Sequence, residues 1–188
     1  MSRWEPNARG RLEEAALQLY IERGFEQTTV AEIANRAGLT ERTFFRHFAD
    51  KREVLFAGSG ALQELLVHTL ADAPESATPI AAVAAAVEAA GVVFQERRDS
   101  VRQRQTVIDA NPELQERELI KLASLAAALA DALRGRGVQE PTASLAAQAG
   151  IAVFRISFER WINETDLEDL PRQIRESFDE LKAVTSGT

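Results

Sequence analysis

Most of the side chains suited to binding chemistry lie in residues 28–51, TTVAEIANRAGLTERTFFRHFADK. Arg42 can reach the O6/N7 edge of a guanine in a bidentate pair, although the same residue type is also common as a solvated surface arginine. Thr40 and Thr43 can bond to phosphates or to bases, and Thr40 can also cap a helix. The chemistry that this segment suggests is hydrogen bonding to DNA.

Further polar residues of the segment have more than one interpretation. Glu41 either accepts a hydrogen bond from cytosine N4 or points sideways to Arg42 or Arg46, and we favour the sideways pairing. Arg46 also adds positive charge to the same stretch. Thr28 and Thr29 precede a helical pattern and are additional candidates for binding phosphate.

Two short helices joined by a tight turn must position these side chains. Thr29 can cap the first helix because its hydroxyl accepts a backbone N–H, and Glu32 can return the bond. Gly38 ends that helix, since glycine enters the left-handed conformation at least cost. Only Leu39 then separates Gly38 from Thr40, the second cap. This spacing predicts a helix-turn-helix, whose second helix enters the major groove of DNA.

Helical periodicity continues through nearly the whole chain, and no segment has a convincing strand pattern. Pairs of a cap residue and a proline, such as Thr78-Pro79 and Asn111-Pro112, begin later helices. We expect an all-α fold of about nine helices. Three form the N-terminal group, a long fourth begins at the capping residue Asp50 and continues to Leu70, and five follow.

Composition excludes several kinds of site. At 188 residues the chain can form one core or two small ones. It has no cysteine, which excludes disulfides, thiolate metal sites and cysteine nucleophiles. No apolar run approaches the roughly 20 residues of a membrane helix, and the N-terminus lacks the apolar core of a signal peptide. We therefore expect a cytoplasmic protein that does not enter a membrane.

The net charge of −7 is concentrated outside the predicted helix-turn-helix. Residues 1–60 hold nine Lys/Arg and nine Asp/Glu, whereas residues 61–188 hold thirteen and twenty. Contacts with phosphate supply much of the affinity for DNA. The distribution of charge therefore permits DNA binding in spite of the acidic total.

A dense set of sequence elements occurs in one register over residues 11–55. These elements are Gly24-Phe25, Thr28-Thr29-Val30, Ile33-Ala34, Ala37-Gly38 and the run TFFRHF that starts at Thr43, followed by Lys51. With this set and an all-helical remainder of matching length, the chain resembles the tetracycline-repressor (TetR) family. The resemblance covers the part after residue 55 only in length and helical layout.

The resemblance implies a homodimeric DNA-binding regulator, usually a repressor, with a DNA-binding domain at residues 1–52. It also implies a ligand-binding and dimerisation domain at residues 53–188. A two-fold dimer presents its recognition helices to half-sites roughly 34–36 Å apart. A small molecule that favours a different spacing of the two helices lowers the affinity for the palindromic operator.

The resemblance also assigns roles to three residues of the predicted recognition helix and its exit. His47 and Lys51 match family positions that touch the phosphate backbone, although a lone histidine is also common as a structural residue. Phe45 stands where the family commonly has a tyrosine that donates to phosphate. Without the hydroxyl, Phe45 can pack on a thymine methyl group or on a sugar.

The last two helices are the expected dimer surface, because small residues along a helix allow close packing across a two-fold axis. The candidates are Leu145, Ala149, Ala152, Ile156, Trp161, Ile174, Phe178 and Leu181. The alternative is that these residues form ordinary intramolecular core.

Polar residues in otherwise apolar helices are the candidates for contacts with a small-molecule ligand. They are His68, Gln95, Arg102, Gln105, Gln148 and Arg155. The alternative for each is a surface position or a local hydrogen bond.

The sequence has few of the residues and motifs from which an enzyme active site is built. The chain has two histidines, no cysteine, no glycine-rich phosphate loop and no metal-ligand spacing, so we expect neither catalysis nor a cofactor. The remaining alternative is a helical interaction module whose degenerate helix-turn-helix does not bind DNA. The acidic C-terminal part, Glu41 and Phe45 are compatible with that alternative.

Overall fold

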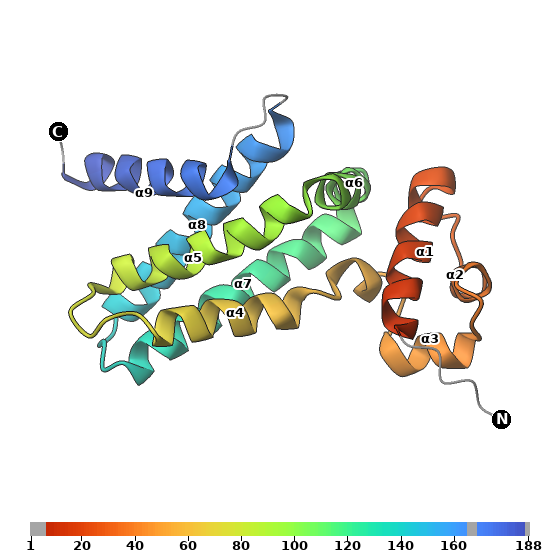
Figure 1. Ribbon diagram of the computed structural model, residues 1–188, viewed down its shortest axis with the longest axis horizontal. Helices are drawn as coiled ribbons and strands as arrows, with labels where there is room; N and C mark the ends of the chain where they lie inside the picture. Colours follow the sequence, from red (N-terminus) through yellow and green to blue (C-terminus); the bar gives the residue numbers. More distant parts are fainter. Residues whose placement is uncertain (1–6, 165–168, 187–188) are drawn as a thin grey trace. The chain divides into compact units, whose positions relative to one another are not determined.

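The computed structural model describes residues 7–164 and 169–186, and the all-α prediction is confirmed there (Figure 1). Within these residues the chain forms nine α-helices and one 3-10 helix, without a strand. The elements are α1 (Ala8–Arg23), α2 (Val30–Arg36), α3 (Glu41–His47), η1 (Glu53–Phe56), α4 (Ser59–Ala71), α5 (Pro79–Glu96), α6 (Arg98–Asp109), α7 (Pro112–Gly135), α8 (Thr142–Asn163) and α9 (Leu170–Ser186).

The chain divides into two compact units, and each is built from two separate stretches. The head unit comprises Met1–Ser59 and Asp99–Glu118. The body unit comprises Gly60–Arg98 and Leu119–Thr188. The head unit therefore contains the three N-terminal helices together with most of α6 and the start of α7. The functional boundary at residue 52 stays a prediction.

The core of the head unit forms around one face of α1. The residues buried on that face follow an i, i+3, i+4, i+7, i+8 spacing, which brings them onto one side of the helix. They are Leu12, Ala15, Ala16, Leu19 and Tyr20. Phe44 and Phe48 from α3 and its exit pack into the same core, and Val107, Ile108 and Leu114 join it from α6 and α7.

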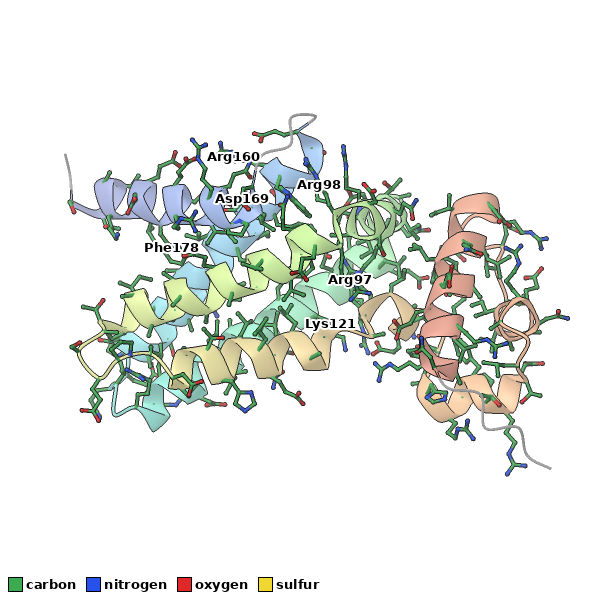
Figure 2. The ribbon with its side chains drawn as sticks, in the orientation of Figure 1. Arg97, Arg98, Lys121, Arg160, Asp169 and Phe178 are labelled. Atoms are coloured by element: carbon green, nitrogen blue, oxygen red, sulfur yellow. The ribbon has the colours of Figure 1, made fainter. Side chains whose placement is uncertain are left out.

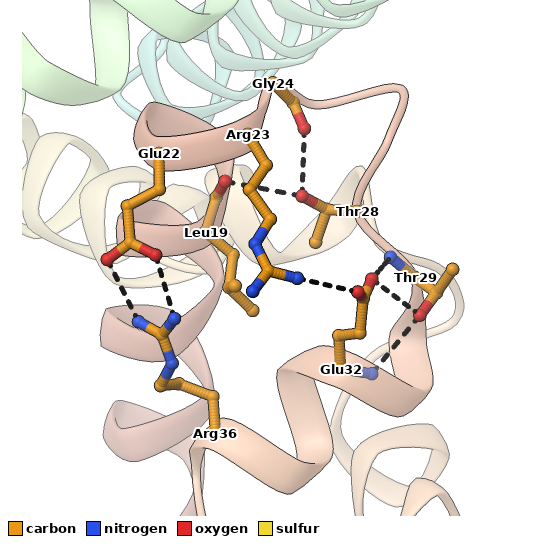
Figure 3. Close-up of polar contacts among 8 residues, drawn as sticks. All are labelled: Leu19, Glu22, Arg23, Gly24, Thr28, Thr29, Glu32 and Arg36. Carbon is orange, nitrogen blue, oxygen red and sulfur yellow. Dashed lines mark hydrogen bonds and ion pairs between the residues drawn. The ribbon is translucent and has the colours of Figure 1, made fainter.

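Hydrogen bonds at the start of α2 confirm the predicted capping box (Figure 3). Thr29 Oγ1 accepts from the Glu32 N–H at 3.3 Å, and Glu32 Oε2 accepts from the Thr29 N–H at 2.9 Å. These bonds, with Arg23 beside them, hold the pKa of Glu32 below its usual range. After α2, Gly38 has a φ of 66°, which is the left-handed conformation that the tight turn requires.

A single ammonium group holds the turn between α1 and α2. Lys51 Nζ donates to the carbonyls of Phe25 at 2.8 Å, Thr28 at 3.0 Å and Glu26 at 3.3 Å. It also lies 4.4 Å from the centre of the Phe25 ring. An ammonium has three protons, so these bonds use its full capacity. In return, Tyr20 Oη donates to the Lys51 carbonyl at 2.6 Å, and burial raises the pKa of that phenol.

The predicted long fourth helix is wrong at its start, because the chain is broken there into η1 and α4. Asp50 does bind the chain at the start of η1, since its Oδ1 accepts from the Arg52 and Glu53 N–H groups at 2.8 and 3.2 Å. Glu53, however, does not return the bond. Its carboxylate instead accepts from Arg117 Nε at 2.6 Å, a partner 64 residues away.

The body unit is built around α5, which packs on α8 and α9. Two glycines permit the close approach of these helices. A methyl group at Gly150 of α8 would overlap Val83 Cγ1 of α5. A methyl group at Gly91 of α5 would lie 2.6 Å from Ile174 Cδ1 of α9.

Two helical segments are long and apolar enough to cross a bilayer by length and composition alone, which differs from the expectation drawn from the sequence. They are Glu53–Ala71 and Pro79–Glu96. The first is interrupted between η1 and α4. The second is α5, whose Ala82, Val83 and Ala86 are buried in the body unit. An apolar helix in the centre of a folded domain gives the same composition.

Replacing Lys51 by Met tests the ammonium clamp. The variant keeps an apolar stem but leaves three carbonyls without their donor, so we expect the free energy of unfolding to fall by about 2–4 kcal/mol. Urea unfolding followed by circular dichroism measures the change. Lys182→Met is the matched control, because Lys182 forms only an exposed ion pair with Asp179. A loss no larger than that of the control would contradict the role given to Lys51.

Replacing Gly150 by Ala tests the close packing of α8 on α5. The new methyl group must displace Val83, which we expect to destabilise the protein by about 1–3 kcal/mol in spite of the better helix propensity of alanine. Gly135→Ala in α7 is the control, since nothing lies within 4 Å of its added methyl group. Thermal unfolding of both variants, and of Gly150→Ala combined with Val83→Ala, separates overlap from propensity. If Gly150→Ala and Gly135→Ala change the thermal midpoint equally, overlap with Val83 is excluded.

Candidate nucleic-acid interface

The residues of α3 divide between a buried and an exposed face. Phe44 and Phe48, four positions apart, are buried in the head unit. Arg42, Arg46 and Phe45 are exposed, and 55% of the Phe45 surface is open to solvent. Such a large aromatic surface on a short exposed helix is available to a partner.

The N-terminus of α3 is fixed by the two threonines that the sequence singled out. Thr40 Oγ1 accepts from the Thr43 N–H at 3.2 Å, and the two hydroxyl oxygens lie 3.1 Å apart. Thr40 therefore caps α3, and capping was one of the two roles expected of this residue. Its exposed hydroxyl keeps a further hydrogen-bonding position open.

The favoured pairing of Glu41 with Arg42 or Arg46 is not found. All three side chains are exposed, and no ion pair joins them within the described residues. Consecutive helical residues do not face each other, and an ion pair along a helix needs a spacing of three or four positions. Glu41 lies next to Arg42 and five positions from Arg46, so neither spacing suits a pair.

Most cationic side chains of the chain are bonded to an acid or to a backbone carbonyl. Arg36, for example, binds Glu22 through two hydrogen bonds of 3.1 and 2.8 Å (Figure 3). Within residues 7–164 and 169–186 the arginines that have neither an ion pair nor a side-chain hydrogen bond are Arg42, Arg46, Arg97 and Arg102. Two of these four lie on α3 at positions i and i+4, which place their guanidinium groups on the same side of the helix.

The remaining candidates for contact with phosphate are either at least partly buried or engaged in other hydrogen bonds. Thr28 is 1% exposed, and its hydroxyl donates to the Gly24 carbonyl at 2.9 Å (Figure 3). Burial therefore removes the Thr28 side chain from the surface, which corrects its expected role. The ammonium of Lys51 is likewise taken by three carbonyls. Thr29 is exposed, but its hydroxyl belongs to the capping box, and His47 is half-buried with its Nε2 turned inward.

The predicted dimer residues separate into exposed and buried groups. Leu145, Ala149, Ala152 and Ile156 recur along α8 at intervals of four, three and four, so they form one stripe, which we call the α8 stripe. Leu145 is 66% exposed and Ile156 is 49% exposed. Both residues thus leave large apolar surfaces in contact with water.

The other predicted dimer residues are mostly core of the body unit, which corrects their expected role. Trp161 is fully buried, and its Nε1 donates to Gln95 Oε1 at 2.9 Å. Ile174 and Phe178 are buried as well, and Phe178 lies on the side of α9 toward α5 (Figure 2). Leu181 is half-buried near the end of α9.

The ligand candidates do not gather at one site. Gln95 accepts from Trp161 and from the Leu170 N–H at 3.1 Å, so its amide oxygen has a structural role. Gln105 is buried in the head unit, where its Nε2 donates to Asp109 Oδ1 at 2.8 Å. Arg102 also belongs to the head unit. The three others, His68, Gln148 and Arg155, are exposed residues of the body unit.

Family models match both parts of the chain. The model described as bacterial regulatory proteins, tetR family, matches residues 12–57. The model described as the MftR C-terminal domain matches residues 77–186.

One curated relative and two solved structures are similar to the chain. The regulator TcmR of Streptomyces glaucescens is 38% identical over 81 residues, 43% of this chain and 36% of TcmR, so the chain spans about a third of that relative. FadR of Thermus thermophilus, in complex with lauroyl-CoA, has 24% identity and a TM-score of 0.58 over 96% of this chain and 94% of FadR. SmeT, the repressor of the Stenotrophomonas maltophilia efflux pump SmeDEF, has 22% identity and a TM-score of 0.67 in its triclosan complex, over 94% and 90%.

At these identities the two solved structures establish the all-helical fold. The first family model covers most of α1 together with α2, α3 and η1, and the second covers α5 to α9. The chain belongs to the tetR family of bacterial regulatory proteins, with a C-terminal part of the MftR type.

Proposed function

We propose that the protein is a homodimeric DNA-binding transcriptional regulator of the cytoplasm. It represses from a palindromic operator and is released when a small molecule binds in the body unit. The observation that carries this proposal is the pair of exposed arginines on α3, Arg42 and Arg46, which have no partner within the described residues.

Free guanidinium groups on α3 explain how an acidic chain binds a polyanion. The affinity for DNA depends on the cations that reach phosphate, since each one releases condensed counterions. Arg42, in the first turn of α3, is placed to read a guanine, and Arg46, one turn later, to bind phosphate. The exposed ring of Phe45 adds an apolar surface for a thymine methyl group or a sugar.

The α8 stripe supplies the proposed dimer surface. Its alanines allow a second copy of α8 to approach closely across a two-fold axis, and Leu145 and Ile156 lose their contact with water there. A two-fold dimer presents two copies of α3 to half-sites roughly 34–36 Å apart.

The body unit is the proposed site of the inducing ligand. Two proteins of similar fold are known in complex with small molecules, FadR with lauroyl-CoA and SmeT with triclosan. Both ligands have an apolar part, and we propose a small molecule with an apolar part for this chain as well. Such a ligand releases the protein from the operator only if it prefers one arrangement of the dimer. It must bind more tightly to the arrangement that does not fit the operator than to the one that does.

Selection of operators from a random duplex library tests the proposal, with gel-shift titrations over a series of salt concentrations. We expect a palindromic motif and an affinity that falls steeply with salt. The absence of binding to any duplex at low salt would overturn the proposal and favour the helical interaction module.

Arg42→Ala should weaken binding to the selected operator by about 1–3 kcal/mol, because a bidentate contact to a base is lost. A repeated selection with the variant should recover a motif with relaxed preference at one position in each half-site. Arg97→Ala is the matched control, since Arg97 is also without a partner within the described residues but follows α5. An unchanged motif for Arg42→Ala would contradict base reading by this residue.

Leu145→Glu should weaken the dimer at least about tenfold, because two carboxylates then meet near the two-fold axis in a desolvated contact. Sedimentation velocity over a range of protein concentrations measures the shift towards monomer. Leu119→Glu introduces the same charge at an exposed leucine of α7 and serves as the control. If both variants keep the mass of the wild type, the α8 stripe is not the dimer surface.

A further inference from the structure

A second candidate binding site lies inside the head unit, apart from the α3 surface. It is a cavity of about 320 Å³, open on one side, between the C-terminal end of α1 and the C-terminal end of α6. Its volume falls at the lower end of the roughly 300–1,000 Å³ typical of small-molecule pockets. The lining residues are Tyr20, Ile21, Gly24, Phe25, Glu26, Thr106, Val107, Ala110 and Asn111.

The walls of this cavity are mainly apolar. Tyr20 and Phe25 meet edge to face, with ring centres 5.1 Å apart, and Val107 is buried beside them in the head core. Ile21 is 50% exposed, so an apolar side chain is left open to water. At Gly24 nothing lies within 4 Å of the place that a methyl group would take. An apolar molecule can therefore approach the Ile21 side chain and the backbone of Gly24.

Several of the polar groups around the cavity can accept a hydrogen bond from a ligand. Thr106 Oγ1 donates its proton to the Arg102 carbonyl at 3.0 Å, and Asn111 Nδ2 donates one of its two protons to the Val107 carbonyl at 2.6 Å. Lys51, whose ammonium binds the Glu26 carbonyl, has its three protons on backbone oxygens. The Glu26 carboxylate is exposed and has no ion pair within the described residues.

Helix ends add to this preference for a positive ligand. The α1 and α6 helices both end at the cavity, and the C-terminus of a helix carries a partial negative charge. The last carbonyls of a helix also lack donors from the helix itself. The α6 carbonyls of Val107 and Asp109 are bonded by Asn111 and Gln115. By contrast, the α1 carbonyls of Ile21 and Glu22 accept from no donor within the described residues.

We propose that this cavity binds a small apolar molecule that carries one protonated amine. The apolar part packs on Tyr20, Ile21 and Val107, and the ammonium lies near Glu26 and the open end of α1. The proposal is independent of DNA binding and concerns a different site from the ligand of the body unit.

The position of the cavity gives such a ligand a measurable effect on stability. One wall belongs to α1 and the other to α6, two segments about 85 residues apart in the chain that meet in the head unit. A ligand that fills the space between them binds only when they are in contact. It therefore raises the midpoint of thermal unfolding, and the rise grows with the logarithm of the ratio of ligand concentration to dissociation constant.

The test uses the intact protein and three probes of nearly the same shape, 2-phenylethylamine, 2-phenylethanol and phenylacetate. Amide chemical shifts followed by NMR titration at neutral pH give the dissociation constants and identify the residues affected. We expect shifts at Ile21, Gly24 and Ala110, and a dissociation constant for the amine about tenfold lower than that for the alcohol. The carboxylate should bind most weakly, and the thermal midpoint should rise in the same order.

Two variants and a control complete the test. Ala110→Phe fills the cavity from an exposed position and should abolish binding of all three probes. Glu26→Gln keeps shape and exposure and should remove the advantage of the amine over the alcohol. Glu116→Gln, at an exposed glutamate of the head unit outside the cavity, should change neither. The proposal is overturned if no probe binds saturably, if the alcohol or carboxylate equals the amine, or if Glu26→Gln leaves the preference for the amine intact.

Discussion

The ammonium of Lys51 is the contact on which the geometry of the DNA-binding head depends. It holds the carbonyls of Phe25, Glu26 and Thr28, and these residues form the turn that leads into α2. The position of this turn determines where Thr29 can begin α2, and the short turn after Gly38 then determines where α3 begins. An apolar core alone leaves a polar turn free to move, whereas three bonds to a single cation give it one position. The exposed face of α3 thus takes its place from a residue that lies outside α3.

Cations bound to backbone carbonyls recur through the chain. Arg11 donates to the Ala37 carbonyl at the end of α2, and Arg104 to the Leu55 carbonyl of η1 at 2.6 Å. Arg98 donates to the Trp161 and Glu164 carbonyls at the end of α8, and Arg136 to the Ala71 and Ala73 carbonyls after α4. Since carbonyls at helix ends lack partners within the helix, a long cationic side chain is an effective cap. Few cationic side chains are therefore left to bind a nucleic acid, and two of them, Arg42 and Arg46, lie together on α3. An acidic chain can present a DNA-binding surface because this small positive region is confined to α3.

The sequence predicted well those features that depend on neighbouring residues. Caps such as Thr29, the left-handed Gly38 and the buried face of α1 need only a few positions of chain, so their signals are local. The features that it left undecided depend on distant partners. A lysine can bind a phosphate or a carbonyl with the same three protons, and only the folded head brings Phe25 and Thr28 to Lys51. Likewise α8 has apolar residues on more than one side, and periodicity does not tell which side α5 and α9 cover. The sequence therefore leaves open whether Trp161 belongs to a dimer surface or to the core, and in the structure it is core.

Because the head unit is made of two stretches, its apolar core is not completed by the N-terminal stretch alone. Val107 and Ile108 of α6 and Leu114 of α7 complete the core around α1, and they follow some 50 residues after the end of η1. During synthesis on the ribosome, the first 59 residues emerge before the chain that closes their core. The nascent helix-turn-helix consequently waits for α6 before it reaches full stability. A fragment cut after η1 leaves part of its apolar core facing water, so transfer of this reading head to another protein requires residues 99–118 as well.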